Sequence, residues 1–322
     1  MIRSMASGDD VRVMVLAGGL SYERDVSLRS GRRVLDALRD VGVQAELHDS
    51  DVALLPALQE DPPDAVLIAL HGATGEDGSL RGVLDLCGVP YVGPDAHASR
   101  VAWDKPSAKA MLSEAGIPTP EWVALPHDRF SELGAVAVLD RIVDRLGLPL
   151  MIKPAQGGSG LGAAVVREEA DLPAAMVGCF AYYTTALVEK YVPGKNIAVS
   201  IVDLGSGPQA LPPVEIVPRD GVYDYAARYT AGLTTWHAPA RLDEKTTARV
   251  IEVSLAAHKT LGLRDMSRVD LIVTEDGSPQ VLGTNVSPGL TETSLLPLAV
   301  QAAGLSLGRV LATLIERAAA RG

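Results

Sequence analysis

Two neighbouring apolar runs of this sequence carry side chains that could hold a hard cation. Residues 268–273 and 280–290 flank an Asp-Gly turn, which predicts a hairpin because glycine accepts the positive φ that such turns require. Side chains two apart share one face of a strand, so we expect Arg268 beside Asp270, with Asn285 on the opposite strand. A carboxylate facing an amide oxygen suits Mg²⁺, with waters and substrate phosphates as its other ligands. An ordinary hairpin with a solvated aspartate is the alternative.

A glycine-rich loop supplies a second candidate site. Residues 155–162 follow an apolar run that carries Lys153 near its end, and a further apolar run, 163–166, comes next. The NH groups of such a flap, with an ammonium at its entrance, suit phosphates. The loop is not a P-loop, since no Lys-Ser or Lys-Thr pair closes it, and not a dinucleotide fingerprint, since a strand rather than a helix follows. A mobile hairpin is the alternative.

Predicted parallel strands near the start of the chain position a third group of residues. Runs 11–17 and 65–70 are almost wholly apolar, and apolar positions between residues 28 and 38 predict a helix after the first run. Strands that alternate with helices predict an α/β domain, in which ligands bind beyond the carboxyl ends of the strands. Glu23 and His71 follow two of these ends, so we expect both to face a small substrate. A histidine in such a place can also be purely structural.

Two later segments could complete a binding site. The run 186–192 predicts a strand whose backbone, with Glu189 or Lys190 beside it, could hold an adenine. A half-solvated edge strand is the alternative. The connection 219–239 is long and rich in aromatic residues, which predicts an ordered lid. We place a domain boundary near residue 102, before the start of a predicted helix.

Composition limits the class of protein. The 322 residues are 47% hydrophobic and 21% charged, as in globular proteins with two or three domains. The net charge of -11 argues against a nucleic-acid surface. No uncharged apolar stretch reaches the about 20 residues that span a membrane. Residues 1–10 lack the apolar middle of a signal peptide and indicate a frayed tail. We therefore expect a cytoplasmic protein without nucleic-acid or membrane partners.

Several stretches resemble the D-alanine-D-alanine ligases, a family with the ATP-grasp fold. They are residues 18–27, the loop 71–78, Asp104-Lys105, Lys153 with its glycine-rich loop, Tyr223-Asp224-Tyr225 and residues 285–289. Together they cover nearly the whole chain in the family's order. The resemblance implies a three-domain α/β fold. A parallel-sheet domain would span residues 1–102, a central ATP-grasp domain 103–188, and a C-terminal ATP-grasp and catalytic domain 189–322.

The resemblance also implies a reaction. ATP would phosphorylate the carboxylate of one D-alanine, and the amine of a second D-alanine would attack the acylphosphate to give a dipeptide for peptidoglycan precursors. Tyr229 goes with dipeptide rather than depsipeptide formation in this family. A homodimer is a further expectation from the resemblance alone.

Positions that match the family imply a role for each site residue. ATP would be held by Lys105 and Lys153 at its phosphates, by Arg228 near the γ-phosphate, and by Glu189, Lys190 and Val192 at the adenine. The Mg²⁺ ligands would be Asp270 and Asn285. The catalytic and substrate-binding residues would be Glu23, His71, Ser159, Tyr229, Arg268, Ser287, Gly289 and Ser294.

The roles within this last group differ. Arg268 would stabilise the charge of the tetrahedral intermediate. Glu23 would receive the ammonium group of the first substrate, and Ser294 the carboxylate of the second. Ser159 and Tyr229 would complete a hydrogen-bond chain with Glu23.

The sequence departs from the family at three positions. Gly283 stands where the family has a glutamate that bridges two Mg²⁺ ions, Asn196 where it has a glutamate for the ribose, and Arg228 where it has a lysine. The missing carboxylate removes a metal ligand, so metal binding and phosphoryl transfer should weaken. Two other interpretations therefore stay open: an ATP-grasp ligase for other amino acids, and a metal-impaired homologue that binds nucleotide without turnover.

Overall fold

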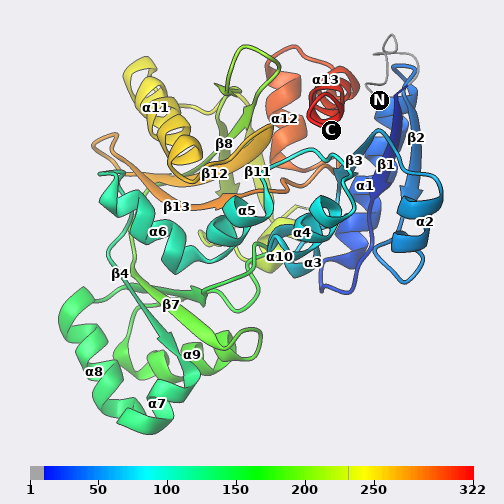
Figure 1. Ribbon diagram of the computed structural model, residues 1–322. Coiled ribbons are helices and arrows are strands. Elements are labelled where there is room, and N and C mark those ends of the chain that lie inside the picture. Colours follow the sequence, from blue (N-terminus) through cyan, green and yellow to red (C-terminus); the bar gives the residue numbers. More distant parts are fainter. Residues whose placement is uncertain (1–10, 231) are drawn as a thin grey trace.

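Three sheets make up the architecture, seen in a computed structural model that describes residues 11–230 and 232–322 (Figure 1). The tail expected at residues 1–10 lies outside the described part. The sheets follow one another along the chain, and the first is parallel while the other two are antiparallel. The described part is therefore mixed α/β, as predicted.

The first sheet is parallel, in the order β2-β1-β3, and helices cover both of its faces. Its elements are β1 (Arg12–Leu16), α1 (Arg24–Arg39), β2 (Gln44–His48), α2 (Leu54–Glu60), β3 (Ala65–Ile68), α3 (Ala73–Glu76) and α4 (Ser79–Leu86). Side chains alternate along β1, so Val13 and Val15 join a core with α1, and Met14 and Leu16 join another core with α2. Two covered faces explain why these strands are continuous apolar runs.

The second sheet is antiparallel, in the order β4-β7-β5-β6. Its elements are β4 (Trp122–Pro126), α7 (His127–Leu133), α8 (Ala135–Leu146), β5 (Leu150–Pro154), β6 (Ala164–Val166), a 3-10 turn (Glu169–Asp171), α9 (Leu172–Phe180) and β7 (Thr185–Lys190). Helices α7, α8 and α9 lie on one side of this sheet (Figure 1). Along β5, Leu150 and Ile152 point into that core, while Met151 and Lys153 line a cavity on the other face.

The third sheet is antiparallel, in the order β11-β10-β8-β12-β13, with β9 also beside β8. Its strands are β8 (Lys195–Val202), β9 (Gln209–Ala210), β10 (Val214–Pro218), β11 (Thr234–His237), β12 (Met266–Val273) and β13 (Pro279–Asn285). Its helices are α5 (Ala96–Trp103), α6 (Lys105–Glu114), α10 (Tyr225–Tyr229), α11 (Glu244–Thr260), α12 (Leu295–Ala302) and α13 (Leu307–Ala319). Residues of α5, α6 and α11 share one core with this sheet, whereas α12 and α13 join it to the first sheet.

The hairpin predicted around the Asp-Gly turn is present as β12 and β13. Gly277 in the turn has a φ of 77°, in the region that favours glycine. Asp270 pairs with Gly283 and Arg268 with Asn285, and the register shifts directly after Asp270. The predicted glycine-rich loop between two strands is also present, joining β5 to β6.

One of the two expected domain boundaries falls inside a strand. Strand β7 continues to Lys190, past the boundary placed at residue 188. Helix α6 lies within the expected central domain, but its Ala108 and Leu112 pack with Val199 and Leu271 of the third sheet. The chain therefore runs from the first sheet onto the third before it forms the second. A linear division of the sequence misses this excursion.

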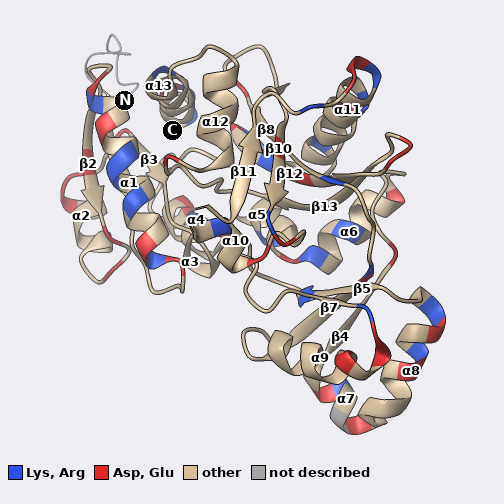
Figure 2. Cartoon of the chain, turned by 180° about the vertical axis from the view of Figure 1, so that it is seen from behind, with Lys and Arg blue, Asp and Glu red and all other residues tan. Residues whose placement is uncertain are grey.

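The surface helices mix both charges, and residues of both signs occur along α1, α8 and α11 (Figure 2). The connection 219–239 contains α10 and β11, so its described parts have regular structure, as predicted. No single helix in the described ranges is long and apolar enough to cross a membrane. Helices α12 and α13 pass such a test only as a pair bent by 106°, and both belong to the core.

Candidate active site

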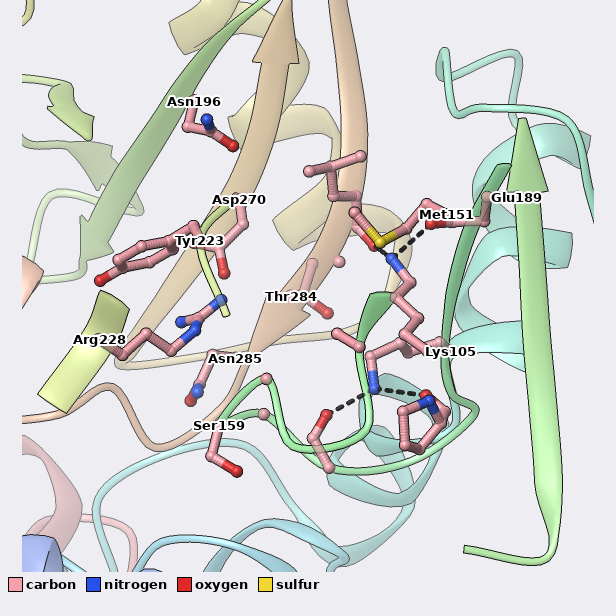
Figure 3. Close-up of a pocket in the computed structure, with 18 of the residues that line it drawn as sticks. Lys105, Met151, Ser159, Glu189, Asn196, Tyr223, Arg228, Asp270, Thr284 and Asn285 are labelled. Carbon is pink, nitrogen blue, oxygen red and sulfur yellow. Dashed lines mark hydrogen bonds and ion pairs between the residues drawn. The ribbon is translucent and has the colours of Figure 1, made fainter. Parts of the chain in front are cut away.

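A cavity of about 1640 Å³, partly open to solvent, lies between the second and third sheets. Lys153 of β5 and Asp270 of β12 both line it, and the glycine-rich loop closes one end (Figure 3). A smaller second cavity of about 740 Å³ adjoins it. The two cavities share Ser159, Arg268 and Asn285, so a group bound in one can contact a group bound in the other.

A buried carboxylate fixes the lysines of the first cavity. Glu189 on β7 is 1% exposed, and its two oxygens lie 2.7 Å from Nζ of Lys109 and 2.6 Å from Nζ of Lys153. Burial would raise the pKa of Glu189, but the two ammonium groups outweigh it and hold the pKa below its ordinary value. Lys109 also contacts the hydroxyl of Thr119. This cluster ties α6 to β5 and β7.

Lys105 holds the entrance of the glycine-rich loop. Its Nζ donates to the carbonyl oxygens of Pro154 at 3.2 Å and Gly157 at 2.5 Å (Figure 3). Burial, reinforced by the neighbouring charge of Lys153, lowers the pKa of Lys105 to about 7. The ammonium therefore lies where a phosphate under the loop would favour its charged form.

The opposite wall of the first cavity is an ion pair on β12. Arg268 Nε lies 2.7 Å from Oδ1 of Asp270, and Nη2 lies 2.8 Å from Oδ2. Burial would raise the pKa of Asp270, but Arg268 outweighs it and keeps the carboxylate ionised. Asn285 on the paired strand accepts a hydrogen bond from the backbone N of Ser287 at 2.8 Å, which fixes its amide oxygen.

Two residues of this wall could offer oxygen ligands to a Mg²⁺ ion. Asp270 and Asn285 offer a carboxylate and an amide oxygen from adjacent strands, and both line the first cavity. Within the described ranges, no group of three or more His, Cys, Asp or Glu side chains gathers as a metal site. Gly283 lies opposite Asp270, and a Cβ built on it meets no atom within 4 Å. The missing carboxylate thus leaves open space rather than a substitute ligand.

The second cavity collects most residues assigned to amino-acid binding. Its lining includes Glu23, His71, Ser159, Tyr229, Arg268, Gly289 and Ser294. Ser287 differs, because its buried hydroxyl lies 3.2 Å and 3.0 Å from the carbonyl oxygens of Ile68 and Leu70. It joins the end of β13 to the end of β3 and does not line either cavity.

Glu23 and His71 both line the second cavity, as expected for loops beyond parallel strands. Gly72 has a φ of 71°, and a Cβ on it would lie 2.4 Å from Oε2 of Glu23, so only glycine allows this approach. Nε2 of His71 lies 3.0 Å from Oγ of Ser30, and burial lowers its pKa to about 4. His71 is therefore neutral at ordinary pH.

The hydrogen-bond chain expected from Glu23 through Ser159 and Tyr229 is open. All three side chains are described, and no hydrogen bond joins any two of them in this structure. Burial raises the pKa of Tyr229 to about 12, and the nearby charge of Glu23 also raises it. The three groups thus surround a space in which substrate could bridge them.

The far end of the first cavity provides apolar walls and backbone groups. Met151 and Leu282 line it from opposite sheets, and Lys190 and Val192 line it at the end of β7. The carboxylate of Glu189 is paired with two lysines and is not free to bind an adenine. The backbone groups of the residues after Glu189 are the ones that could accept hydrogen bonds from such a ring or donate them to it. Asn196 also lines this cavity (Figure 3).

Sequence reasoning missed two buried charged residues of the site. Lys109 lies one helical turn after Lys105 on α6, and helical spacing could have placed both on one face. Glu76 lines both cavities and accepts a hydrogen bond from Gly72 N at 2.9 Å. Burial raises the pKa of Glu76 to about 7. Its loop stood out in the sequence, but nothing there indicated that this carboxyl turns inward.

Sequence comparisons agree with this geometry. The family model "D-ala D-ala ligase C-terminus" matches residues 111–316, and "D-ala D-ala ligase N-terminus" matches residues 50–94. A D-alanine--D-alanine ligase of Nitrosomonas europaea is 41% identical over 313 residues, 97% of this chain and 98% of that protein. One of Pelotomaculum thermopropionicum is 37% identical over 308 residues, 96% of each chain.

Solved structures of similar proteins extend over almost the whole chain. The D-alanine--D-alanine ligase from Bacillus anthracis has a TM-score of 0.81 at 32% identity, covering 97% of this chain and 98% of that one. The same ligase complexed with ATP has a TM-score of 0.79 at 30% identity, with the same coverage. VanG D-Ala:D-Ser ligase from Enterococcus faecalis has a TM-score of 0.81 at 27% identity, covering 95% of this chain and 98% of that one.

The fold and the lysine-lined cavity between its antiparallel sheets define a nucleotide-binding ligase of the ATP-grasp class. Within this class, the chain belongs to the D-alanine-D-alanine ligase family.

Nucleotide binding should take up a proton through Lys105. A lysine with a pKa near 7 is mostly neutral at about pH 8, and phosphates favour its charged form, so affinity for ATP should fall as the pH rises through 7. Calorimetry in buffers of different ionisation enthalpy measures the uptake at about pH 8 and about pH 6. We expect larger uptake at the higher pH, and a reduced uptake in Lys105→Met. An uptake that is unchanged in this variant would contradict the assignment.

Removal of Lys109 should destabilise the protein and weaken ATP binding. Lys109→Met leaves the buried carboxylate of Glu189 with only Lys153, and breaking such a pair costs about 3 kcal/mol or more. The remaining lysine is then drawn more strongly towards Glu189 and away from phosphates. Thermal unfolding and ATP titration measure both effects. The double variant Lys109→Met/Glu189→Gln should recover much of the stability. Equal melting temperatures for the single and the double variant would show that the ion pair of Lys109 and Glu189 does not stabilise the protein.

Proposed function

We propose that this protein joins two molecules of D-alanine while converting ATP to ADP and phosphate. One observation carries the proposal: two cavities meet at Arg268. The first contains the cations Lys105 and Lys153, the second presents Ser294, and Glu23 lines both. A reaction that phosphorylates a carboxylate and then attacks it with an amine needs two such adjoining cavities. The family membership supports D-alanine as the substrate.

The first step transfers the γ-phosphoryl group of ATP to the carboxylate of the first D-alanine, forming D-alanyl phosphate and ADP. Lys105 and Lys153 neutralise phosphate charge, and the buried carboxylate of Glu23 holds the ammonium group of the amino acid. Asp270 and Asn285 would hold Mg²⁺, which neutralises further phosphate charge when bound. Positioning and charge neutralisation supply most of the catalysis of phosphoryl transfer.

In the second step, the amine of the second D-alanine releases a proton to solvent and attacks the carbonyl carbon of the acylphosphate. Phosphate then leaves, and the dipeptide remains. Arg268, fixed by Asp270, stabilises the oxyanion, a contribution of about 3 kcal/mol. Ser294 binds the carboxylate of the second substrate, and Ser159 and Tyr229 complete their hydrogen bonds through bound substrate.

A ligase for a different second amino acid is a second candidate function. The fold is as similar to the VanG D-Ala:D-Ser ligase as to the ligase from Bacillus anthracis, with TM-scores of 0.81 for both. The polar lining of the second cavity, which includes Thr291 and Thr293, is compatible with a hydroxyl-bearing substrate. Product analysis with mixed amino acids separates the two candidates.

Membership of the family supports a role in making peptidoglycan precursors. We further propose that the protein is a cytoplasmic homodimer. A homologue that binds nucleotide without turnover remains the non-enzymatic alternative, because Gly283 supplies no carboxylate beside Asp270.

Isotope transfer tests the acylphosphate step. With D-alanine labelled with ¹⁸O in its carboxylate, the oxygen that attacks the γ-phosphorus leaves with the phosphate. We expect one labelled oxygen per phosphate released, by mass spectrometry, together with D-alanyl-D-alanine and ADP. Arg268→Met should lower the yield of both products by at least about a hundredfold. Unlabelled phosphate would exclude the acylphosphate, and nucleotide binding without any product would favour the non-enzymatic alternative.

A further inference from the structure

Arg228 is a cation without a carboxylate partner in the part of the chain that the structure describes. It lies in α10, and its guanidinium carbon is 4.1 Å from the ring centroid of Tyr223. Its Nε is buried and donates a hydrogen bond to no other described residue. The residue lines both cavities, and its guanidinium points towards the space between Asp270 and Asn285 (Figure 3). A stacked, unpaired guanidinium at this place is a receptor for an anion.

The same space lacks the carboxylate that a second cation would need. Gly283 lies opposite Asp270, and it offers no side chain. Asp270, the carboxylate that β12 and β13 present to the first cavity, is already paired with Arg268 through both oxygens. A second divalent ion here would therefore meet a fixed positive charge and too few ligands.

We infer that the site holds one divalent cation with ATP, on Asp270 and Asn285, and that the guanidinium of Arg228 replaces a second cation at the terminal phosphate. The inference rests on the proposed use of ATP. A guanidinium suits this place because it remains charged at all working pH values and can donate two parallel hydrogen bonds to phosphate oxygens. Stacking on Tyr223 fixes its plane without an ion pair that phosphate would have to displace.

The residues at positions 228 and 283 act as a pair. Separately, each loses something: Gly283 removes a metal ligand, and an arginine is larger than a compact ammonium point charge. Together, they replace a second divalent ion and its carboxylate ligand by one fixed cation, the guanidinium at position 228. The exchange keeps the charge that faces the γ-phosphate positive while it removes the need for a bridging ligand.

Counting bound metal tests this directly. Mn²⁺ serves as the probe, because its free form is quantified by electron paramagnetic resonance, and the β,γ-imido analogue of ATP prevents turnover. The wild type should bind one Mn²⁺ per chain in the analogue complex. The double variant Gly283→Glu/Arg228→Lys should bind two, with spin coupling between them. The glutamate has room to fold in, since a Cβ at position 283 meets no atom within 4 Å.

Single variants separate charge from structure. Arg228→Ala should still bind one Mn²⁺ but should bind the analogue at least about tenfold more weakly, the effect of losing a charge-assisted hydrogen bond. Arg219→Ala is the matched control, because Arg219 is an exposed arginine of the same connection and lies outside both cavities. It should bind like the wild type.

Two results would overturn the inference while leaving the proposed function intact: two Mn²⁺ per wild-type chain, or unchanged analogue affinity in Arg228→Ala. A wild type that binds no analogue at any Mn²⁺ concentration would overturn the inference and the proposed function together.

Discussion

The buried carboxylate of Glu189, held between the ammonium groups of Lys109 and Lys153, is the interaction on which the site depends. It joins α6, which packs on the third sheet, to β5 and β7 of the second sheet, so it sets the relation of the two walls. A buried charge of this kind is tolerable only when its partners stay in place. Glu189 is matched by two lysines and Asp270 by Arg268. Among the described residues, Lys105 and Arg228 are therefore left to face the cavity without carboxylate partners.

This charge distribution explains why the cavity suits a triphosphate. Phosphoryl transfer requires positive charge that is already oriented, and here it comes from side chains on three different elements. The wall formed by β12 and β13 presents Asp270 as its carboxylate, because Gly283 opposite it has no side chain. The protein therefore depends more on fixed side-chain cations.

Much of this arrangement could be predicted from the sequence. The Asp-Gly turn predicted the β12 and β13 hairpin, and continuous apolar runs predicted the parallel strands that precede the loops of Glu23 and His71. The domain division could not be read linearly, because α6 packs on a sheet whose strands come later in the chain. The inward turn of Glu76 depends on tertiary burial, which local patterns do not encode. Ser287 lies in a matched motif, yet its hydroxyl bridges strands instead of lining a cavity.

The central claim is that this site is catalytically competent with Gly283 in place of a metal-bridging carboxylate. Phosphate release from ATP in the presence of D-alanine, followed across a Mg²⁺ titration, tests it most directly when the wild type is compared with Gly283→Glu. We expect the two proteins to turn over at similar maximal rates, and the release to require D-alanine. Turnover by Gly283→Glu alone would contradict the claim and would identify the natural chain as a metal-impaired member of its family.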